Sequence, residues 1–440
     1  MIDKNELPPG WAIAKFEDLL DYIQPTEYIV ASTEYDDKYK TPVLTAGKSF
    51  IKGYTNETNG IFDALPVIIF DDFTTAIQFV NFPFKVKSSA MKILKPTSDL
   101  VNIKLAFYFM KTVHLKSETH KRYWISEYSK LLIPLPPHNE QKKIFDKIEE
   151  HFIILDKGIE SLRTAQKQLK VYRQAVLKWA FEGKLTNKNV VDGELPKGWC
   201  WKTIEDVADI ATGVTPLRTD KSFWENGTIP WITSGALNDT FVYKAEEFVT
   251  QKAFDETTLK LLPKHTLLLA LYGEGKTRGK CSELMFESTT NQAIAGIKLK
   301  KEFEESRNFL KWFLLKNYQD IRLLSAGGVQ PNLNSTIVKK TPFPFPSPTE
   351  QKKIIQEIES RLSVCDKIEE AIETSLLQAE ALRLSIIKKG FEGKLVKQNP
   401  KDESAEILLA KIRAEIKKNS PEKPEKKVKI KTSKKKKELA

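Results

Sequence analysis

Two stretches of the chain carry apolar residues at alternating spacings of three and four. The first follows Glu140 and the second follows Glu350. This spacing is typical of a coiled-coil seam, in which one face of a helix is covered by a partner helix. Neither stretch contains a proline, and a glycine, Gly183 or Gly393, lies near its end. The pattern predicts two helices of about 44 residues, each roughly 65 Å long.

Each predicted helix has a single apolar face. The seam positions are Ile144, Ile148, Phe152, Leu155, Ile159, Leu162, Leu169, Tyr172, Val176 and Trp179 in the first helix, and Ile358, Leu362, Cys365, Ile368, Ile372, Leu376, Ala379, Leu382 and Ile386 in the second. Most globular helices are much shorter, so a seam of this length needs a partner. The nearest partner for each helix is the other, and we expect them to pair about an internal pseudo-twofold axis.

The chain is duplicated well beyond these helices. Leu7-Pro-Pro-Gly-Trp11 returns as Leu195-Pro-Lys-Gly-Trp199, and Phe181-Glu-Gly-Lys-Leu185 returns as Phe391-Glu-Gly-Lys-Leu395. The first spacing is 188 residues and the second is 210, so the second copy is 22 residues longer in its middle. A period of this length is too long for a solenoid repeat and indicates a duplicated domain.

The middle of each copy predicts a mixed α/β domain. Short apolar runs at 66–70 and 267–271 predict buried strands, and aromatic-rich segments at 103–113 and 309–323 predict helices. The expected fold is therefore two duplicated α/β domains separated by two long, antiparallel coiled-coil helices. The predicted segments are 1–133 and 191–342 for the α/β domains, 134–190 and 343–398 for the helices, and 399–440 for a basic, disordered tail. Within the tail, 404–418 could form one amphipathic helix, and the lysine run after Ser420 predicts disorder.

Most of the net positive charge lies in the last 30 residues of the sequence. The chain carries +12, but residues 411–440 hold 13 basic and 4 acidic residues, or +9, which leaves +3 for the rest. Nucleic-acid binding by the body therefore requires local basic patches. The three cysteines lie far apart, which argues against disulfides or a zinc site and for a reducing cytoplasm. No stretch predicts a membrane span or a signal peptide.

Three patterns that could signal chemistry are weak. Gly273-Glu-Gly-Lys-Thr277 lacks the first glycine of a phosphate-binding loop, because Ala270 stands there. Asp71-Asp72 lacks the further acid and lysine that a metal-dependent nuclease needs, so a turn role is favoured. The five histidines have neither metal-ligand spacing nor a nucleophile context. We expect no catalytic residues and no metal site.

Basic, amide and aromatic side chains gather in the two middles. Arg and Lys pair with guanine edges and Asn and Gln with adenine edges in the major groove. The candidate DNA-binding residues are Lys48, Lys52, Tyr54, Lys85, Lys87, Ser88, Ser89, Lys121, Arg122 and Tyr123 in the first middle, and Arg218, Lys276, Thr277, Arg278, Lys280, Asn291, Gln292, Gln330 and Asn332 in the second.

The order of these elements resembles the specificity subunit of Type I restriction–modification enzymes. The resemblance rests on duplicated Leu-Pro-x-Gly-Trp, Pro-x-Pro-x-x-x-Glu-Gln-x-x-Ile, a seam helix and Phe-x-Gly-Lys-Leu, and it extends to about Leu395. It implies a non-catalytic protein with two target recognition domains, each reading one half of an asymmetric, bipartite DNA site. The lysine-rich tail departs from the family pattern.

The resemblance also implies partners. Two modification (methyltransferase) subunits would dock on the helices, and restriction subunits would complete an ATP-dependent endonuclease. S-adenosylmethionine, ATP and Mg²⁺ would be bound by those partners and none by this chain. The residues assigned to the helices and their partner interface are Glu140, Gln141, Leu155, Leu162, Phe181, Glu350, Gln351, Leu362, Leu376 and Phe391.

Two alternatives remain open from the residues alone. One is a coiled-coil scaffold with two protein-binding heads. The other is a DNA-modifying enzyme fused to two DNA-reading domains, against which the missing cofactor and metal motifs count.

Overall fold

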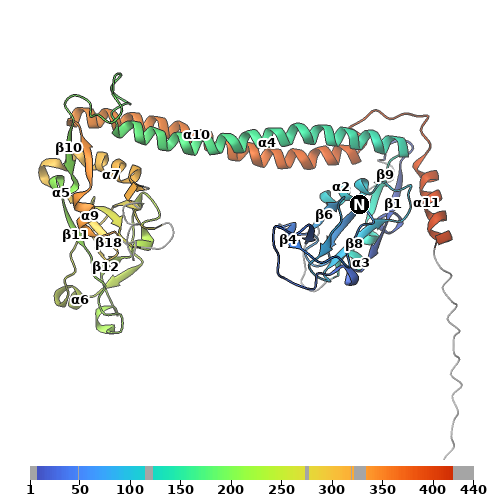
Figure 1. Ribbon diagram of the computed structural model, residues 1–440, viewed down its shortest axis with the longest axis horizontal. Coiled ribbons are helices and arrows are strands. Elements are labelled where there is room, and N and C mark those ends of the chain that lie inside the picture. Colours follow the sequence, from blue (N-terminus) through green and yellow to red (C-terminus); the bar gives the residue numbers. More distant parts are fainter. Residues whose placement is uncertain are drawn as a thin grey trace, which may run out of the picture. The chain divides into compact units, whose positions relative to one another are not determined.

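The computed structural model describes residues 7–47, 49–113, 122–272, 277–318, 320–321 and 333–419, which fold into two units (Figure 1). Unit 1 comprises Met1–Ser161 and Ser375–Ala440, and unit 2 comprises Leu162–Thr374. Each unit therefore combines the start of one long helix with the end of the other. The segments predicted from sequence differ from these units, because they kept each long helix separate from the α/β domains.

Unit 1 contains an α/β domain that precedes the first long helix. Its strands are β1 (Ala12–Lys15), β2 (Leu20–Ile23), β3 (Thr41–Leu44), β4 (Ile51–Thr55), β5 (Val67–Asp71), β6 (Ile77–Val80), β7 (Lys85–Val86), β8 (Met91–Pro96) and β9 (Leu132–Leu135). Its helices are α1 (Phe16–Leu19), α2 (Ile103–Thr112) and α3 (Tyr123–Ser126), with 3-10 turns η2 (Thr26–Tyr28) and η3 (Tyr128–Lys130).

Unit 2 repeats this plan with additions. Its strands are β10 (Cys200–Thr203), β11 (Ala208–Thr212), β12 (Ile229–Ile232), β13 (Phe241–Val242), β14 (Glu247–Val249), β15 (Leu267–Ala270), β16 (Cys281–Leu284), β17 (Thr289–Thr290), β18 (Ile294–Leu299) and β19 (Pro342–Phe345). Its helices are α5 (Ile204–Val207), α6 (Gln251–Glu256), α7 (Arg307–Lys316) and α9 (Ser335–Lys340), with 3-10 turns η4 (Lys221–Phe223), η5 (Ser234–Ala236) and η6 (Lys301–Ser306).

The sheet topologies of the two units match. The order β2-β8-β5-β6 in unit 1 corresponds to β11-β18-β15-β16 in unit 2, which adds β13 at the edge. The three-stranded sheets β4-β3-β7 and β14-β12-β17 correspond, as do the ribbons β1-β9 and β10-β19. The ribbon registers agree, because Ala12 faces Leu135 in one and Cys200 faces Phe345 in the other. The predicted duplication of an α/β domain is confirmed.

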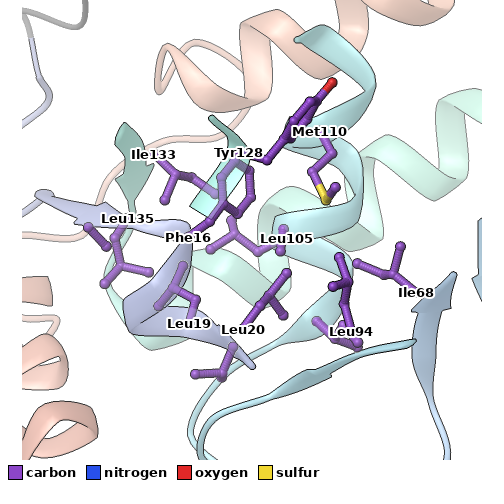
Figure 2. Close-up of a cluster of buried hydrophobic side chains, with 14 of the residues drawn as sticks. Phe16, Leu19, Leu20, Ile68, Leu94, Leu105, Met110, Tyr128, Ile133 and Leu135 are labelled. Atoms are coloured by element: carbon purple, nitrogen blue, oxygen red, sulfur yellow. The ribbon is translucent and has the colours of Figure 1, made fainter. Parts of the chain in front are cut away.

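The main core of unit 1 lies between its four-stranded sheet and α1, α2 and the β1-β9 ribbon. Figure 2 shows Phe16 and Leu19 of α1, Leu105 of α2, Leu94 of β8 and Tyr128 of η3 among its buried side chains. Each fully buried large apolar side chain stabilises the fold by roughly 1.5–3 kcal/mol. The predicted strands at 66–70 and 267–271 and the helix at 103–113 coincide with β5, β15 and α2 to within one residue at each end.

The two predicted long helices are confirmed as α4 (His138–Phe181) and α10 (Pro348–Phe391), each of 44 residues. Each is followed, two residues after its last residue, by a glycine with left-handed backbone, Gly183 (φ 76°) or Gly393 (φ 68°). A Cβ on Gly183 would lie 2.3 Å from Pro196, and one on Gly393 would lie 2.3 Å from Pro8. The repeated Leu-Pro-x-Gly-Trp and Phe-x-Gly-Lys-Leu elements therefore meet in each unit, and only glycine fits there.

Within each unit the segments of α4 and α10 run antiparallel. In unit 1, Arg383 of α10 pairs with Asp156 of α4; in unit 2, Arg173 of α4 pairs with Asp366 of α10 at 2.7 Å. These two ion pairs are copies at the 210-residue spacing of the helices. Both are part-exposed and contribute little to stability, but a charged residue inside a seam fixes the register of the pairing.

The predicted seams are wrong at four positions. Tyr172, Trp179, Ile368 and Leu382 are 39%, 40%, 44% and 51% exposed. At Tyr172 and Leu382 the coiled-coil spacing continues instead through Arg173 and Arg383, because the step after Leu169 and Ala379 is four residues and not three. Apolar side chains at the skipped positions consequently face solvent. No helix within the described ranges has the length and apolar character to cross a bilayer.

The prediction of disorder from residue 399 onward is wrong for the first part of the tail, and the amphipathic helix predicted over 404–418 is confirmed. Helix α11 (Ala405–Asn419) packs on α1 and β1 of unit 1 and buries Leu408, Leu409 and Ile412. Burial raises the pKa of the Asp18 carboxyl, but the hydrogen bonds that it accepts from Arg413 and from the Lys15 backbone amide outweigh burial and hold the pKa below its usual value. The amphipathic pattern of the segment therefore finds a surface within this chain. Residues 420–440 lie outside the described residues.

We expect Leu409→Ala to lower the free energy of unfolding by roughly 2–5 kcal/mol, because the side chain is 6% exposed in the core of unit 1. The control is Ile407→Ala, on the outer face of the same helix at 48% exposure, which should change stability by no more than about 0.5 kcal/mol. Chemical denaturation of the full chain measures both. Equal effects would mean that α11 does not dock as described.

Candidate nucleic-acid interface

In unit 1, the carboxyl ends of the parallel strands β3 and β7 meet at one edge of the three-stranded sheet. Leu44 faces Val86, and the Lys87 amide continues the ladder by donating to the Leu44 carbonyl at 3.1 Å. Two polar turns follow these strands, one starting at Thr45 and the other at Lys87. The Lys87 and Ser89 side chains are exposed and Ser88 is half-buried. No ion pair with a described residue engages Lys87.

Unit 2 has the same edge at the ends of β12 and β17. Ile232 faces Thr290, and the Asn291 amide donates to the Ile232 carbonyl at 3.0 Å. The turn after β12 starts at Thr233 and the one after β17 contains Asn291 and Gln292. Gln292 is exposed and Asn291 is half-buried. We call these two places the strand-end edges: residues 45–47 and 87–89 in unit 1, and 233–236 and 291–292 in unit 2.

Further polar residues of unit 2 join its edge. Thr215 donates a hydrogen bond to the Gln292 side chain, and Lys280 donates to the Asn238 side chain at 2.8 Å, just beyond the turn after β12. Arg218 stacks on Trp224, with 3.9 Å from its guanidinium carbon to the ring centroid, and pairs with Glu247. The predicted residues Arg218, Lys280, Asn291 and Gln292 are thus all held by segments that contact the three-stranded sheet or the turn that follows it.

Two of the predicted DNA-binding residues are structural instead. Lys85 is 3% exposed, pairs with Glu57 at 3.0 Å and donates to the Asn59 carbonyl at 2.6 Å. The backbone amide of Ser32 and the Lys85 ammonium hold the pKa of the Glu57 carboxyl below its usual value. Tyr123 is 2% exposed in the core of unit 1. Neither side chain is accessible to DNA, so these two predictions are wrong.

The remaining candidates divide into two groups. Lys52 is exposed and Tyr54 half-buried on β4, Arg122 is exposed before α3, and Thr277 and Arg278 lie half-buried ahead of Lys280. Their DNA-binding roles stay predictions. The candidates that lie outside the described residues are Lys48, Lys121, Lys276, Gln330 and Asn332.

The residues predicted at the starts of the long helices hold those helices to their own units. Gln141 donates to the Pro136 carbonyl at 2.9 Å, and Gln351 donates to the Pro346 carbonyl at 3.0 Å. Glu140 accepts from the Trp11 indole at 3.1 Å. All three side chains are 2% exposed. The prediction that these residues begin the long helices is confirmed. A role in a partner interface is wrong for them, because their polar atoms are directed inward.

The predicted interface residues at the ends of the long helices are buried, whereas those along the middle are half-buried. Phe181 lies 5.1 Å from Phe309, and Phe391 lies 5.0 Å from Phe109, measured between ring centroids. These two phenylalanines are buried and join the helix ends to α7 and α2, so a partner interface is wrong for them too. The four leucines assigned to the helices and their partner interface are half-buried in the seam: Leu155, Leu162, Leu362 and Leu376.

The acidic pair that could have signalled a nuclease has a structural role. Asp71 accepts hydrogen bonds from the amides of Phe73 and Thr74 in a turn, and Asp72 accepts from the Trp124 amide. The preference for a turn role is confirmed. Among the described residues, no group of three or more His, Cys, Asp or Glu side chains is arranged to hold a metal ion. The Gly273–Lys276 part of the phosphate-loop-like segment lies outside the described residues.

A cluster of charged groups in unit 2 also has a structural explanation. Glu283 of β16 is paired with Lys311 of α7 at 2.8 Å, and with His265 and Arg307. Burial raises the pKa of Glu283, but the hydrogen bonds from Lys311 and His265 outweigh it and leave the pKa below its usual value. At the equivalent sheet and helix positions of unit 1, Phe79 and Phe107 are in contact with 5.6 Å between centroids. The ion pair thus replaces an aromatic pair that joins sheet to helix.

A short sequence signal marks the strand-end edges. Leu44-Thr-Ala-Gly47 returns as Ile232-Thr-Ser-Gly235 at a spacing of 188 residues, which is also the spacing of Leu7 and Leu195. Three or four residues are too few to notice alone, and neither copy is strongly charged. The shared spacing is what connects this Thr-x-Gly turn to the domain duplication.

Comparison with known proteins agrees with this architecture. The family model described as "Type I restriction modification DNA specificity domain" matches residues 8–167 and 196–378. A Type I restriction enzyme specificity subunit from Escherichia coli (EcoR124I/EcoR124II) is 38% identical over 266 residues, which is 58% of this chain and 62% of that protein. One from Methanocaldococcus jannaschii (MjaIX) is 33% identical over 181 residues, 40% of each chain. These matches span less than two thirds of either relative.

One solved structure shares the fold along most of the chain. It comes from work on complex assembly and conformational transition of the type I R-M system. Its TM-score is 0.65 at 15% identity, and the match covers 88% of this chain and 99% of the other. At that identity the likeness concerns the fold.

The start of α4 yields a test with its own internal control. Burial raises the pKa of Glu140, and so does the nearby Asp402 carboxylate, although the Trp11 hydrogen bond opposes them. One oxygen each of Glu140 and Asp402 is buried without a hydrogen-bond partner among the described residues. The folded state favours the protonated form of Glu140. Its contribution to the free energy of unfolding is therefore complete below the usual pKa of 4.5 and declines as the pH rises above it.

We therefore expect Glu140→Gln, which keeps the shape but not the charge, to stabilise the chain by about 1 kcal/mol at pH 7.5 and less near pH 5. The matched variant Glu350→Gln weakens hydrogen bonds from Thr186 and Asn187 and should not stabilise at either pH. Thermal unfolding of the full chain at the two pH values measures both. A gain for Glu140→Gln that does not grow with pH would contradict the assignment.

Proposed function

Because the chain belongs to the family of Type I restriction–modification DNA specificity domains, we propose that it is the DNA-reading subunit of such an enzyme. Each α/β domain reads one half of a bipartite DNA site. The observation that carries this proposal is the pair of strand-end edges, which have the same backbone plan but different side chains. Two readers with different chemistry make the two half-sites different, and together they give more specificity than either alone.

The long helices supply the second part of the proposal. A helix of 44 residues at about 1.5 Å per residue is roughly 66 Å long, comparable with two turns of DNA at about 34 Å each. We propose that the paired helices set the distance between the half-sites. The seam arginines support this role, because a misaligned pairing would separate Arg173 from Asp366 and Arg383 from Asp156.

We also propose that the helices are the docking surface for two modification subunits. The support is a set of large apolar side chains exposed on both helices, more than single scattered residues would explain. In unit 1 these are Ile153, Ile154, Leu377, Leu382 and Leu384, and in unit 2 Val171, Tyr172, Trp179, Val364 and Ile368. Copies at the 210-residue spacing, such as Ile154 and Val364, offer two related sites.

The chemistry belongs to the partners in this proposal. Methyl transfer from S-adenosylmethionine and ATP-dependent cleavage with Mg²⁺ would be carried out by the modification and restriction subunits, in the cytoplasm, on DNA selected by this chain. The relatives are specificity subunits, which supports a non-catalytic role. Methyl transfer by the purified chain alone would sink the proposal and revive the fused-enzyme alternative.

Exchange of the first α/β domain separates the proposal from a protein-binding scaffold. We expect that replacing residues 7–133 with the corresponding segment of another family member changes one half of the methylated sequence and leaves the other half intact. Sequencing methylated bases in cells that carry this chain and its modification subunit measures the result. A scaffold would instead change protein partners and leave the methylated motif as it was.

A pair of adjacent residues tests the docking surface. Ile154→Glu places a charge on a side chain that is 63% exposed, so we expect normal thermal stability but weaker binding of the modification subunit. Leu155→Glu places the same charge in the half-buried seam, where it should lower the melting temperature as well. Size-exclusion chromatography and thermal melts distinguish the two. Normal assembly of the Ile154 variant would show that this face is not the docking surface.

A further inference from the structure

The strand-end edges can be aligned residue by residue, although the two α/β domains share little sequence. Strand register makes Leu44 equivalent to Ile232, and Val86 equivalent to Thr290. The next residue in each unit is Lys87 or Asn291. The Lys87 amide donates to the Leu44 carbonyl at 3.1 Å, and the Asn291 amide donates to the Ile232 carbonyl at 3.0 Å. Lys87 is therefore equivalent to Asn291, and Ser88 to Gln292.

A third segment passes each edge in the same way. The Val30 amide donates to the Val86 carbonyl at 3.0 Å, and the Val214 amide donates to the Thr290 carbonyl at 2.9 Å. Three stretches that are far apart in sequence thus converge at each edge with the same hydrogen bonds. The backbone of this place is duplicated, while its side chains are not.

The turn glycines leave open space beside each edge. A Cβ on Gly47 would come no closer than 3.7 Å to its nearest neighbour, and one on Gly235 no closer than 3.5 Å. Neither glycine is among those with left-handed backbone. By contrast, a Cβ on Gly53 would lie 2.6 Å from Tyr35. The described fold does not require glycine at 47 or 235, and a glycine there leaves the turn backbone open to close approach by a ligand.

The side chains at the equivalent positions of the two units favour different bases. A lysine ammonium donates to the O6 and N7 acceptors of guanine, and amide side chains pair with the N6 and N7 groups of adenine. Lys87 is exposed and has no ion pair with a described residue. Gln292 is exposed and is oriented by the hydrogen bond from Thr215.

We propose that the strand-end edges are the base-reading surfaces, and that residues 87–88 and 291–292 determine the difference between the two half-sites. Lys87 reads a guanine in the half-site of unit 1, and Asn291 with Gln292 reads an adenine in the half-site of unit 2. Gly47 and Gly235 let the DNA come close to the turn backbone. This inference rests on the proposed function and adds to it the surface and residues that set specificity.

The experiment compares methylated motifs of complexes that contain the full chain and its modification subunit. We expect Lys87→Ala to relax discrimination at one guanine of one half-site by roughly 5- to 150-fold, and the double change Asn291→Ala, Gln292→Ala to relax one adenine of the other. The matched controls are Lys95→Ala and Lys298→Ala. These exposed lysines lie at the carboxyl ends of β8 and β18, next to Pro96 and Leu299. Their substitution should leave the methylated motif unchanged.

Equilibrium DNA binding at several salt concentrations provides a second readout. Gly47→Ala and Gly235→Ala are accommodated by the fold, so we expect unchanged thermal melts with weaker binding to the cognate duplex. If Lys87→Ala weakens all sequences equally and lowers the salt slope by about one, Lys87 contacts phosphate and the inference is wrong for it.

An unchanged motif in both edge variants, with unchanged binding by both glycine variants, would overturn the inference and leave the proposed function standing. A wild-type complex that selects no DNA sequence would instead remove the proposed function itself.

Discussion

The interaction on which both units depend is the antiparallel contact between the start of one long helix and the end of the other. Ile144 and Ile148 of α4 lie against Gly390 near the end of α10 in unit 1, where a Cβ would come within 3.2 Å of each. Because each unit takes one helix segment from α4 and the other from α10, neither sequence repeat can complete a unit alone. The duplication is therefore a permuted one: what is repeated in sequence is not what folds together.

The same constraint explains why the repeated sequence elements are where they are. Leu-Pro-x-Gly-Trp opens an α/β domain and Phe-x-Gly-Lys-Leu closes a helix, and each unit brings one of each into contact through a proline and a glycine. Trp11 and Gln141 then bind the start of α4 to unit 1. The elements that looked like family signatures are thus the joints between helices and domains, and buried joints are unavailable to partner subunits.

Unlike the joints between helices and domains, the cores and the surfaces of the two units differ. Glu283 and Lys311 stand where Phe79 and Phe107 join sheet to helix, and the strand-end edges hold Lys87 and Ser88 in one unit and Asn291 and Gln292 in the other. Helix α11 covers α1 and β1 of unit 1 through Leu408, Leu409 and Ile412. One backbone plan thus accepts different cores and different surfaces as long as the ribbon register and the helix joints are kept.

Helix period, duplication and domain class were all determined by the sequence, because apolar spacing and exact repeats are local properties of the chain. The sequence did not determine which residues face the partner helix along the whole seam. A charged residue such as Arg173 breaks the apolar pattern, and only its ion pair with Asp366 shows that it belongs to the seam. The burial of Lys85 and Tyr123 also depended on tertiary contacts, because the residue type alone does not tell whether a lysine or a tyrosine is exposed to DNA or buried in the domain. Only the tertiary structure aligned Lys87 with Asn291, since strand register is set by residues distant in sequence.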